Sequence, residues 1–148
     1  MYSSVPTTCF GRFLIDRHQV GYSNIPVEET RTILTDMLKY HRTDPQTQQE
    51  LLIWHDVITR QNYFSHNQDI ISQHVGLAMG ASSSRLIAEL FLRHMEHTHL
   101  ARLSHKHGII DYFRYVDDIL LIFDPTLTDI QSILTAFNTL HSSLHFTA

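Results

Sequence analysis

Two adjacent carboxylates stand between two apolar segments in Tyr115-Val-Asp-Asp118. Two like charges about 4 Å apart repel each other by about 4 kcal/mol at an effective dielectric constant of about 20. A bound divalent cation relieves this repulsion, and so does a proton retained on one carboxylate. Mg²⁺ prefers oxygen ligands and commonly uses one or two carboxylates together with substrate phosphates. The pair therefore predicts a magnesium site, whereas its spacing alone is more often that of a solvated turn.

The two acids cannot contribute equally to one site if they lie on a regular strand. Successive strand residues point to opposite faces, so only one of Asp117 and Asp118 faces a given side of the sheet. We expect Asp117 to be the main ligand and Asp118 to support it. A further acid, Asp16, stands at the end of an earlier apolar segment.

Short apolar segments predict the strands that position these acids. Ile109 to Phe113 and Ile119 to Phe123 predict a hairpin with the acids at its tip. Phe10 to Asp16 predicts a buried strand that ends at an acid. A second hairpin is expected between Asn62 and Gln73, and Leu144 to Phe146 is expected to begin one more strand.

Start signals and apolar spacing predict the helices. Pro26, followed by Glu28 and Glu29, is typical of a first helical turn, because acidic side chains are favourable near a helix N-terminus. Asp44 before Pro45 predicts a second start, with Asp44 as the cap. Thr128 to Gln131 has the spacing of a capping box. The apolar faces expected for these helices are Ile33, Leu34, Met37 and Leu38; Leu51, Leu52, Trp54, His55 and Ile58, with Trp54 as a core anchor; and Ile130, Ile133, Leu134, Phe137 and Leu140.

A further helix is expected after the loop Gly76-Leu-Ala-Met-Gly80, since Leu86, Ile87, Leu90, Phe91 and Met95 recur at helical spacing. The order of elements predicts an α+β fold, in which helices cover one face of an antiparallel sheet. The other face of such a sheet can stay open to a ligand.

Composition narrows the class of protein. The chain has 148 residues, a net charge of −4 and 43% hydrophobic residues, which predicts one globular domain rather than a disordered polymer. The longest apolar run, Ile119 to Phe123, is too short to cross a bilayer, so no membrane partner is expected. One cysteine and no secretion signal predict an intracellular protein, nuclear or cytoplasmic.

Several motifs, taken in order, resemble the palm of a reverse transcriptase, most closely that of Penelope-type retroelements. The resemblance covers residues 10–148, after a loose segment at 1–9, and it implies a palm domain without its fingers and thumb. The matching segments are Tyr22-Ser-Asn-Ile-Pro26, Gln73 to Gly80 with Ala88-Glu-Leu-Phe91, Tyr112 to Leu120, and Phe137 to His141 with Phe146-Thr147.

The resemblance implies RNA-directed DNA synthesis, with an RNA template, a DNA primer, deoxynucleoside triphosphates and two Mg²⁺ ions. Asp117, Asp118 and Asp16 would be the catalytic metal ligands. In the family, the residue matching Tyr22 packs against the incoming sugar. The remaining implied substrate-binding residues are Gln73, Gly76 and Gly80, in the loop before the motif helix, and Tyr115, beside the primer end.

The first strand departs from the family pattern. The family places its aspartate five residues before the tyrosine, where this chain has Arg17, one residue after Asp16. This departure favours a second hypothesis, a non-enzymatic remnant of a retroelement that binds at most nucleic acid or a partner. A third hypothesis is another palm-like nucleotidyltransferase or cyclase, because one fold hosts several reactions.

Overall fold

The computed structural model describes residues 11–15, 24–60, 63–66, 69–72, 76–77, 81–116 and 118–147. The chain divides into two compact units, residues 1–19 with 99–148 and residues 20–98, which are described separately here. The described elements, in chain order, are β1 (Gly11–Ile15), α1 (Val27–Tyr40), α2 (Pro45–Arg60), β2 (Tyr63–His66), β3 (Asp69–Ser72), α3 (Ser82–His107), β4 (Ile109–Tyr115), β5 (Asp118–Phe123) and α4 (Ile130–Asn138). α3 supplies residues to both units.

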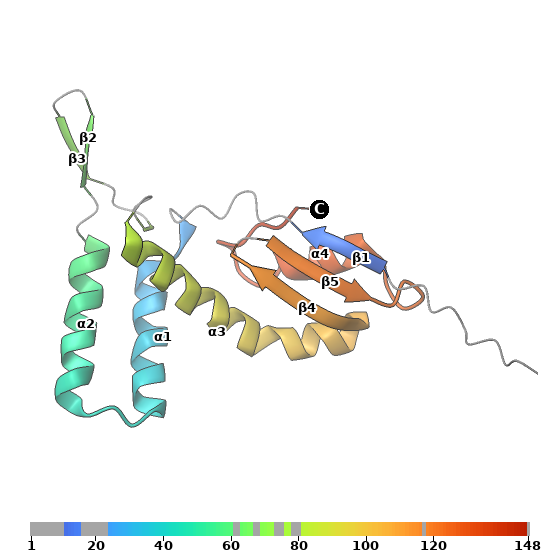
Figure 1. The fold of residues 1–148 in the computed structure, drawn as a ribbon, viewed down its shortest axis with the longest axis horizontal. Coiled ribbons are helices and arrows are strands. Elements are labelled where there is room, and N and C mark those ends of the chain that lie inside the picture. Colours follow the sequence, from blue (N-terminus) through green and yellow to red (C-terminus); the bar gives the residue numbers. More distant parts are fainter. Residues whose placement is uncertain are drawn as a thin grey trace, which may run out of the picture. The chain divides into compact units, whose positions relative to one another are not determined.

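A three-stranded antiparallel sheet forms the first unit, with β5 between β1 and β4 (Figure 1). Apolar β-branched and aromatic residues favour these strands, as predicted. Burial alternates along β5, where Ile119, Leu121 and Phe123 are buried and the residues between them are more exposed. The predicted first strand and the predicted tip hairpin are therefore confirmed.

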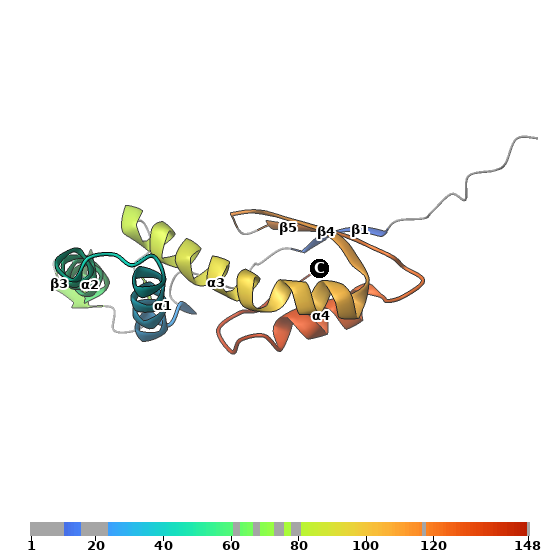
Figure 2. The same ribbon diagram turned by 90° about the horizontal axis from the view of Figure 1, so that it is seen from below.

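Helices cover one face of this sheet. Figure 2 shows α4 and the last turns of α3 on the same side of β1, β4 and β5. Ile133 and Phe137 of α4 are buried, as their spacing predicts. The Phe137 ring stacks on Tyr112 of β4 with a centroid distance of 6.4 Å and meets Phe146 edge-on at 5.4 Å. The predicted α+β class is thus confirmed.

Two expectations about the end of the chain are wrong. The cap of α4 is Asp129 rather than Thr128, because the Asp129 carboxylate accepts a hydrogen bond from the Ser132 amide at 3.0 Å. Leu144 to Phe146 forms no described strand, and the next residue, Thr147, takes part only in a β-bridge; Leu144 and Phe146 are nevertheless buried. The Asn138 side chain bonds both the amide and the carbonyl of Phe146, at 2.7 and 3.0 Å, and so takes the place of a strand partner.

The end of α3 depends on a glycine with a positive φ. Gly108 has φ +59°, and a Cβ built there would lie 2.9 Å from Cδ1 and 3.2 Å from Cβ of Leu127. We expect Gly108→Ala to lower the free energy of unfolding by about 2 kcal/mol, because αL backbone and contact strain add. Urea unfolding measures this loss. Adding Leu127→Ala should recover only part of it, and an unchanged stability of Gly108→Ala would contradict the reasoning.

In the second unit α1 and α2 lie side by side and begin where the sequence predicts (Figure 1). Pro26 is the N-cap residue of α1, with Glu28 and Glu29 in the first turn. The Asp44 carboxylate accepts a hydrogen bond from the Thr47 amide at 2.9 Å and caps α2. The predicted hairpin is also present, as β2 pairs antiparallel with β3. None of the described helices is both long enough and apolar enough to span a membrane.

The face expected for α2 is largely wrong, although His55, one of its residues, is buried as expected. Trp54 is 63% exposed, and Leu51, Ile53, Val57 and Ile58 are exposed as well. The buried residues of α2 are His55 and Thr59, and side-chain hydrogen bonds from His55 and Asp56 connect the helix to α1. Trp54 is therefore not a core anchor of the described unit, because the buried side of α2 carries His55 and Thr59 and leaves Trp54 exposed.

Candidate functional site

The turn between β4 and β5 presents the described part of the predicted metal site. Tyr115 pairs with Asp118, so two residues connect the strands. Val116 has φ 55°, a conformation that a β-branched residue rarely adopts. The Arg114 guanidinium donates a hydrogen bond to the Val116 carbonyl at 3.3 Å. Strained backbone of this kind is frequent at functional sites, and this residue directly precedes Asp117 in the sequence.

Asp118 lies on the face of the sheet that the helices of its unit leave open. Cross-strand partners share a face, so Asp118 and Leu120 lie on the same side as their partners Tyr115 and Phe113. All four are exposed, and Tyr115 is 80% exposed, whereas Ile119 between the two β5 residues is buried. The open face expected from the sequence is present, and it brings Tyr115 and Asp118 together.

The ends of β1 and β5 are neighbours in the sheet. Ile15, the last residue of β1, pairs with Ile119, the second residue of β5. In the sequence Asp16 follows this end of β1, and Asp117 precedes the start of β5. Asp16 and Asp117 lie outside the described residues, as do Tyr22, Gln73 and Gly80.

The loop glycine Gly76 belongs to the unit of residues 20–98. It has φ 75°, which explains why glycine suits this position, and it and Leu77 are buried. Of the predicted substrate-binding residues, only Gly76 and Tyr115 are described, and they belong to different units.

The donor chemistry of the turn fits magnesium better than a softer metal. Asp118 offers exposed carboxylate oxygens, which are hard ligands of the kind Mg²⁺ prefers. Among the described residues no three histidines, cysteines or acids gather into a possible metal site. Of the three carboxylates predicted as ligands, Asp118 alone lies within the described ranges.

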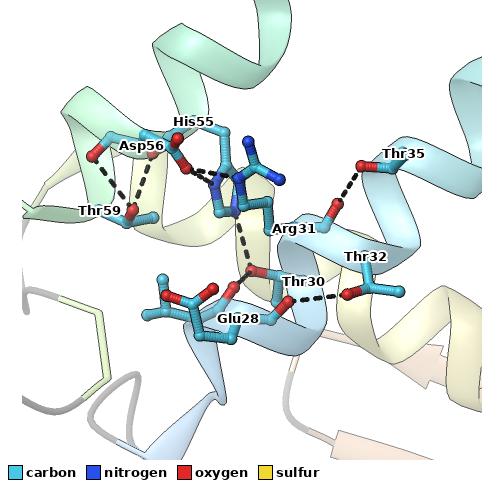
Figure 3. Close-up of polar contacts among 9 residues, drawn as sticks. Glu28, Thr30, Arg31, Thr32, Thr35, His55, Asp56 and Thr59 are labelled. Atoms are coloured by element: carbon cyan, nitrogen blue, oxygen red, sulfur yellow. Dashed lines mark hydrogen bonds and ion pairs between the residues drawn. The ribbon is translucent and has the colours of Figure 1, made fainter.

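A buried polar cluster that the sequence analysis did not predict joins α1 to α2 (Figure 3). Thr30 is fully buried and His55 is 5% exposed. The Thr30 hydroxyl donates to the Val27 carbonyl at 2.7 Å and therefore accepts from His55 Nε2 at 2.9 Å. Arg31 Nε donates to the Asp56 carboxylate at 2.9 Å. The spacing of α2 does place His55 on a buried face, but nothing in the sequence pairs it with Thr30.

The cluster has the side-chain order of a hydrolytic triad, Thr30, His55 and Asp56, but its burial excludes that chemistry. A nucleophile has to reach substrate, and Thr30 has no exposed surface. His55 Nδ1 lies 3.5 Å from the Asp56 carboxylate and has no hydrogen-bond partner within the described structure. The cluster therefore joins two helices rather than catalysing a reaction.

The same cluster makes stability depend on pH. Burial lowers the pKa of His55 despite the opposing effect of Asp56, so the folded state takes up a proton less readily than the unfolded state. Stability should be full above about pH 6.5 and fall as the pH drops through the interval between the unfolded and the folded pKa. Burial also lowers the pKa of His107, so this residue adds to the loss of stability at low pH. Urea unfolding from pH 8 to pH 5 measures the slope.

We expect His55→Gln to flatten that slope, leaving the contribution of His107. His41→Gln replaces a histidine on the loop between α1 and α2, which is exposed, and should keep the slope of the parent chain. A parent stability that rises on acidification would contradict the prediction.

Comparison with known proteins adds no relationship, because no protein-family model and no curated protein matches the chain.

Proposed function

We propose that the chain is a palm domain of an RNA-directed DNA polymerase that extends a DNA primer along an RNA template. The proposal starts from the ordered motifs that resemble Penelope-type reverse transcriptases. It is supported by a sheet whose open face carries Asp118 and Tyr115. Deoxynucleoside triphosphates and two Mg²⁺ ions are the implied substrate and cofactor.

One observation carries the proposal furthest: the pairing of the end of β1 with the start of β5. Two-metal chemistry needs carboxylates from different parts of the chain at one place. The sequence neighbours of these paired ends are Asp16 and Asp117. If the turn between β4 and β5 had no function, nothing would require the neighbouring strand β1 to be followed by an acid as well.

The residues of the chain have distinct proposed roles. Asp117 and Asp16 would hold the metal ions, and Asp118 would support them. When bound, the two ions supply charge neutralisation at the attacking and leaving oxygens of phosphoryl transfer. Tyr115 lies on the open face and would pack beside the primer end. Phosphoryl transfer of this type depends on positioning and charge, so no serine, cysteine or histidine nucleophile is required.

Four further residues would contact the substrates. Tyr22 would pack against the incoming sugar and exclude a 2′-hydroxyl. Gln73, Gly76 and Gly80 would line the approach of template and nucleotide, where glycine permits close contact with backbone. The positive φ of Gly76 is consistent with that role.

A second candidate function is a non-enzymatic remnant, which Arg17 favours. A guanidinium at the position where the family holds its first acid would repel Mg²⁺. Such a remnant would bind nucleic acid weakly or serve as a partner surface. The third hypothesis, a different palm-like nucleotidyltransferase or cyclase, shares the metal geometry but needs no template.

A primer-extension assay distinguishes the three candidate functions. The purified chain is incubated at low salt with an RNA template, a labelled DNA primer and deoxynucleoside triphosphates, because few phosphate contacts would survive high salt. We expect extension that follows the template sequence, needs Mg²⁺ and stops when the metal is chelated. Nucleotide addition or cyclisation without template favours the third hypothesis. An unextended primer, in the presence of measurable RNA binding, favours the remnant.

A further inference from the structure

A cavity of about 630 Å³ lies within the first unit, between the last turns of α3 and α4. Figure 2 shows these two helix segments running side by side beneath the sheet. The volume is typical of a small-molecule site. The residues of α3 that line it are His99, Arg102, Leu103, Lys106 and His107. The facing wall, called the α4 wall here, consists of Ser132, Thr135 and Ala136 of α4 with Thr139 and Leu140 directly after its end.

The α3 wall is basic although the chain is acidic. Residues 99–148 contain three lysines and arginines, namely Arg102, Lys106 and Arg114, and the first two line the cavity. The residues that line it include no carboxylate. The nearest acid in sequence, Asp129, directs its carboxylate to the amide and hydroxyl of Ser132 as the cap of α4.

The dipole of α3 explains only some of the basic residues on this wall of the cavity. Cations in the last turn of a helix interact favourably with its dipole, and Lys106 and His107 lie there. This effect fades within one turn, so it does not explain Arg102 or His99. An exposed guanidinium and an exposed ammonium along one cavity wall together suit a phosphate group, which Arg binds with two parallel hydrogen bonds.

The α4 wall presents hydrogen-bond acceptors, whereas the α3 wall presents cationic donors. The hydroxyl protons of Ser132, Thr135 and Thr139 are donated to Asp129, to the Gln131 carbonyl and to the Ala136 carbonyl. Their oxygens are therefore left as acceptors. Acceptors on this wall suit a ligand that donates hydrogen bonds, such as one that carries several hydroxyl groups, and they do not suit a second phosphate.

We propose that this cavity binds a sugar phosphate, with the phosphate against Arg102 and Lys106 and the sugar hydroxyls against the threonines of the α4 wall. The apolar side chains of Leu103, Ala136 and Leu140 would contact the carbon skeleton of the sugar. The site lies on the helix-covered side of the sheet, whereas Asp118 lies on the open side, so it is distinct from the proposed polymerase site and does not depend on it.

Isothermal titration of the full chain with ribose 5-phosphate, inorganic phosphate and ribose tests the site. We expect ribose 5-phosphate to bind about tenfold or more tightly than either fragment, because it engages both walls. Arg102→Gln and Lys106→Gln should each weaken its binding about tenfold. Lys39→Gln, which removes an exposed cation of α1, is the matched control and should change nothing.

Thr135→Val tests the acceptor wall separately. It keeps the shape of an exposed side chain and removes the acceptor, so it should weaken ribose 5-phosphate and leave inorganic phosphate unchanged. Equal affinity for ribose 5-phosphate and inorganic phosphate would overturn the assignment of a sugar. Undetectable binding of ribose 5-phosphate, or binding weakened as much by Lys39→Gln, would overturn the site. Binding of a single-stranded RNA that depends on Arg102 and Lys106, with ribose 5-phosphate unbound, would overturn the proposal in favour of a nucleic-acid groove.

Discussion

Asp117→Asn is expected to abolish template-directed nucleotide incorporation, a loss of more than about a hundredfold in rate. An amide keeps the size of the side chain but removes the negative charge that a hard cation requires. Loss of a residue that only orients metal ligands costs about 10–100-fold, and loss of the main ligand should cost more. Asp118→Asn, at the supporting position, is expected to fall within that smaller range. Single-turnover primer extension measures both rates.

The matched control for Asp117→Asn is Asp111→Asn. Asp111 is an exposed acid on β4 near the end of the strand that lies away from the turn. Its replacement changes the net charge by the same amount but should leave the rate of the parent chain. Equal incorporation by Asp117→Asn and the parent would refute the assignment of the metal site, and an equal loss in Asp111→Asn would show that net charge alone sets the rate.

Thr30→Val is expected to lower the free energy of unfolding by about 2 kcal/mol. Valine has nearly the shape of threonine, so the packing of α1 is kept. The substitution removes the hydroxyl that accepts the hydrogen bond from His55 Nε2, and His55 Nδ1 already has no hydrogen-bond partner among the described residues. A buried donor that loses its acceptor costs about 1–3 kcal/mol. Urea unfolding at pH 8, where His55 is neutral, measures the loss.

Thr32→Val is the control on the same helix. The Thr32 hydroxyl bonds the Glu28 carbonyl at 3.1 Å and its side chain is exposed, so its replacement should change stability by less than about 0.5 kcal/mol. Equal effects of the two substitutions would mean that threonine at these positions matters only through helix propensity. The double variant Thr30→Val with His55→Phe should recover part of the loss, because it removes donor and acceptor together.

Local patterns were sufficient to predict most elements of the fold. The hairpin of β4 and β5 follows from two apolar runs around polar residues, and the start of α2 follows from Asp44 before Pro45. Both signals are short-range and depend on backbone preferences that the chain carries locally. The open face beside Asp118 also follows, since alternation along a strand determines which residues share a face.

Features that depend on specific side-chain contacts between separate segments were not predictable. The apolar stripe of α2 predicts that Trp54 is buried, but the contact between the two helices is made by Thr30 with His55. Asn138 replaces a strand partner for Phe146 through two side-chain hydrogen bonds. A periodicity shows that a face is apolar, but it does not show which element will pack there.

The central position of β5 in the sheet makes the placement of Asp118 depend on the correct pairing of two strands. β5 is hydrogen-bonded to β1 along one edge and to β4 along the other. A slip of one residue against its neighbours would turn Leu121 and Phe123 out of the core. The same slip would turn the Asp118 carboxylate away from solvent. A misaligned copy would lose both its packing and the exposed acid proposed as a metal ligand, so correct alignment of this strand determines both at once.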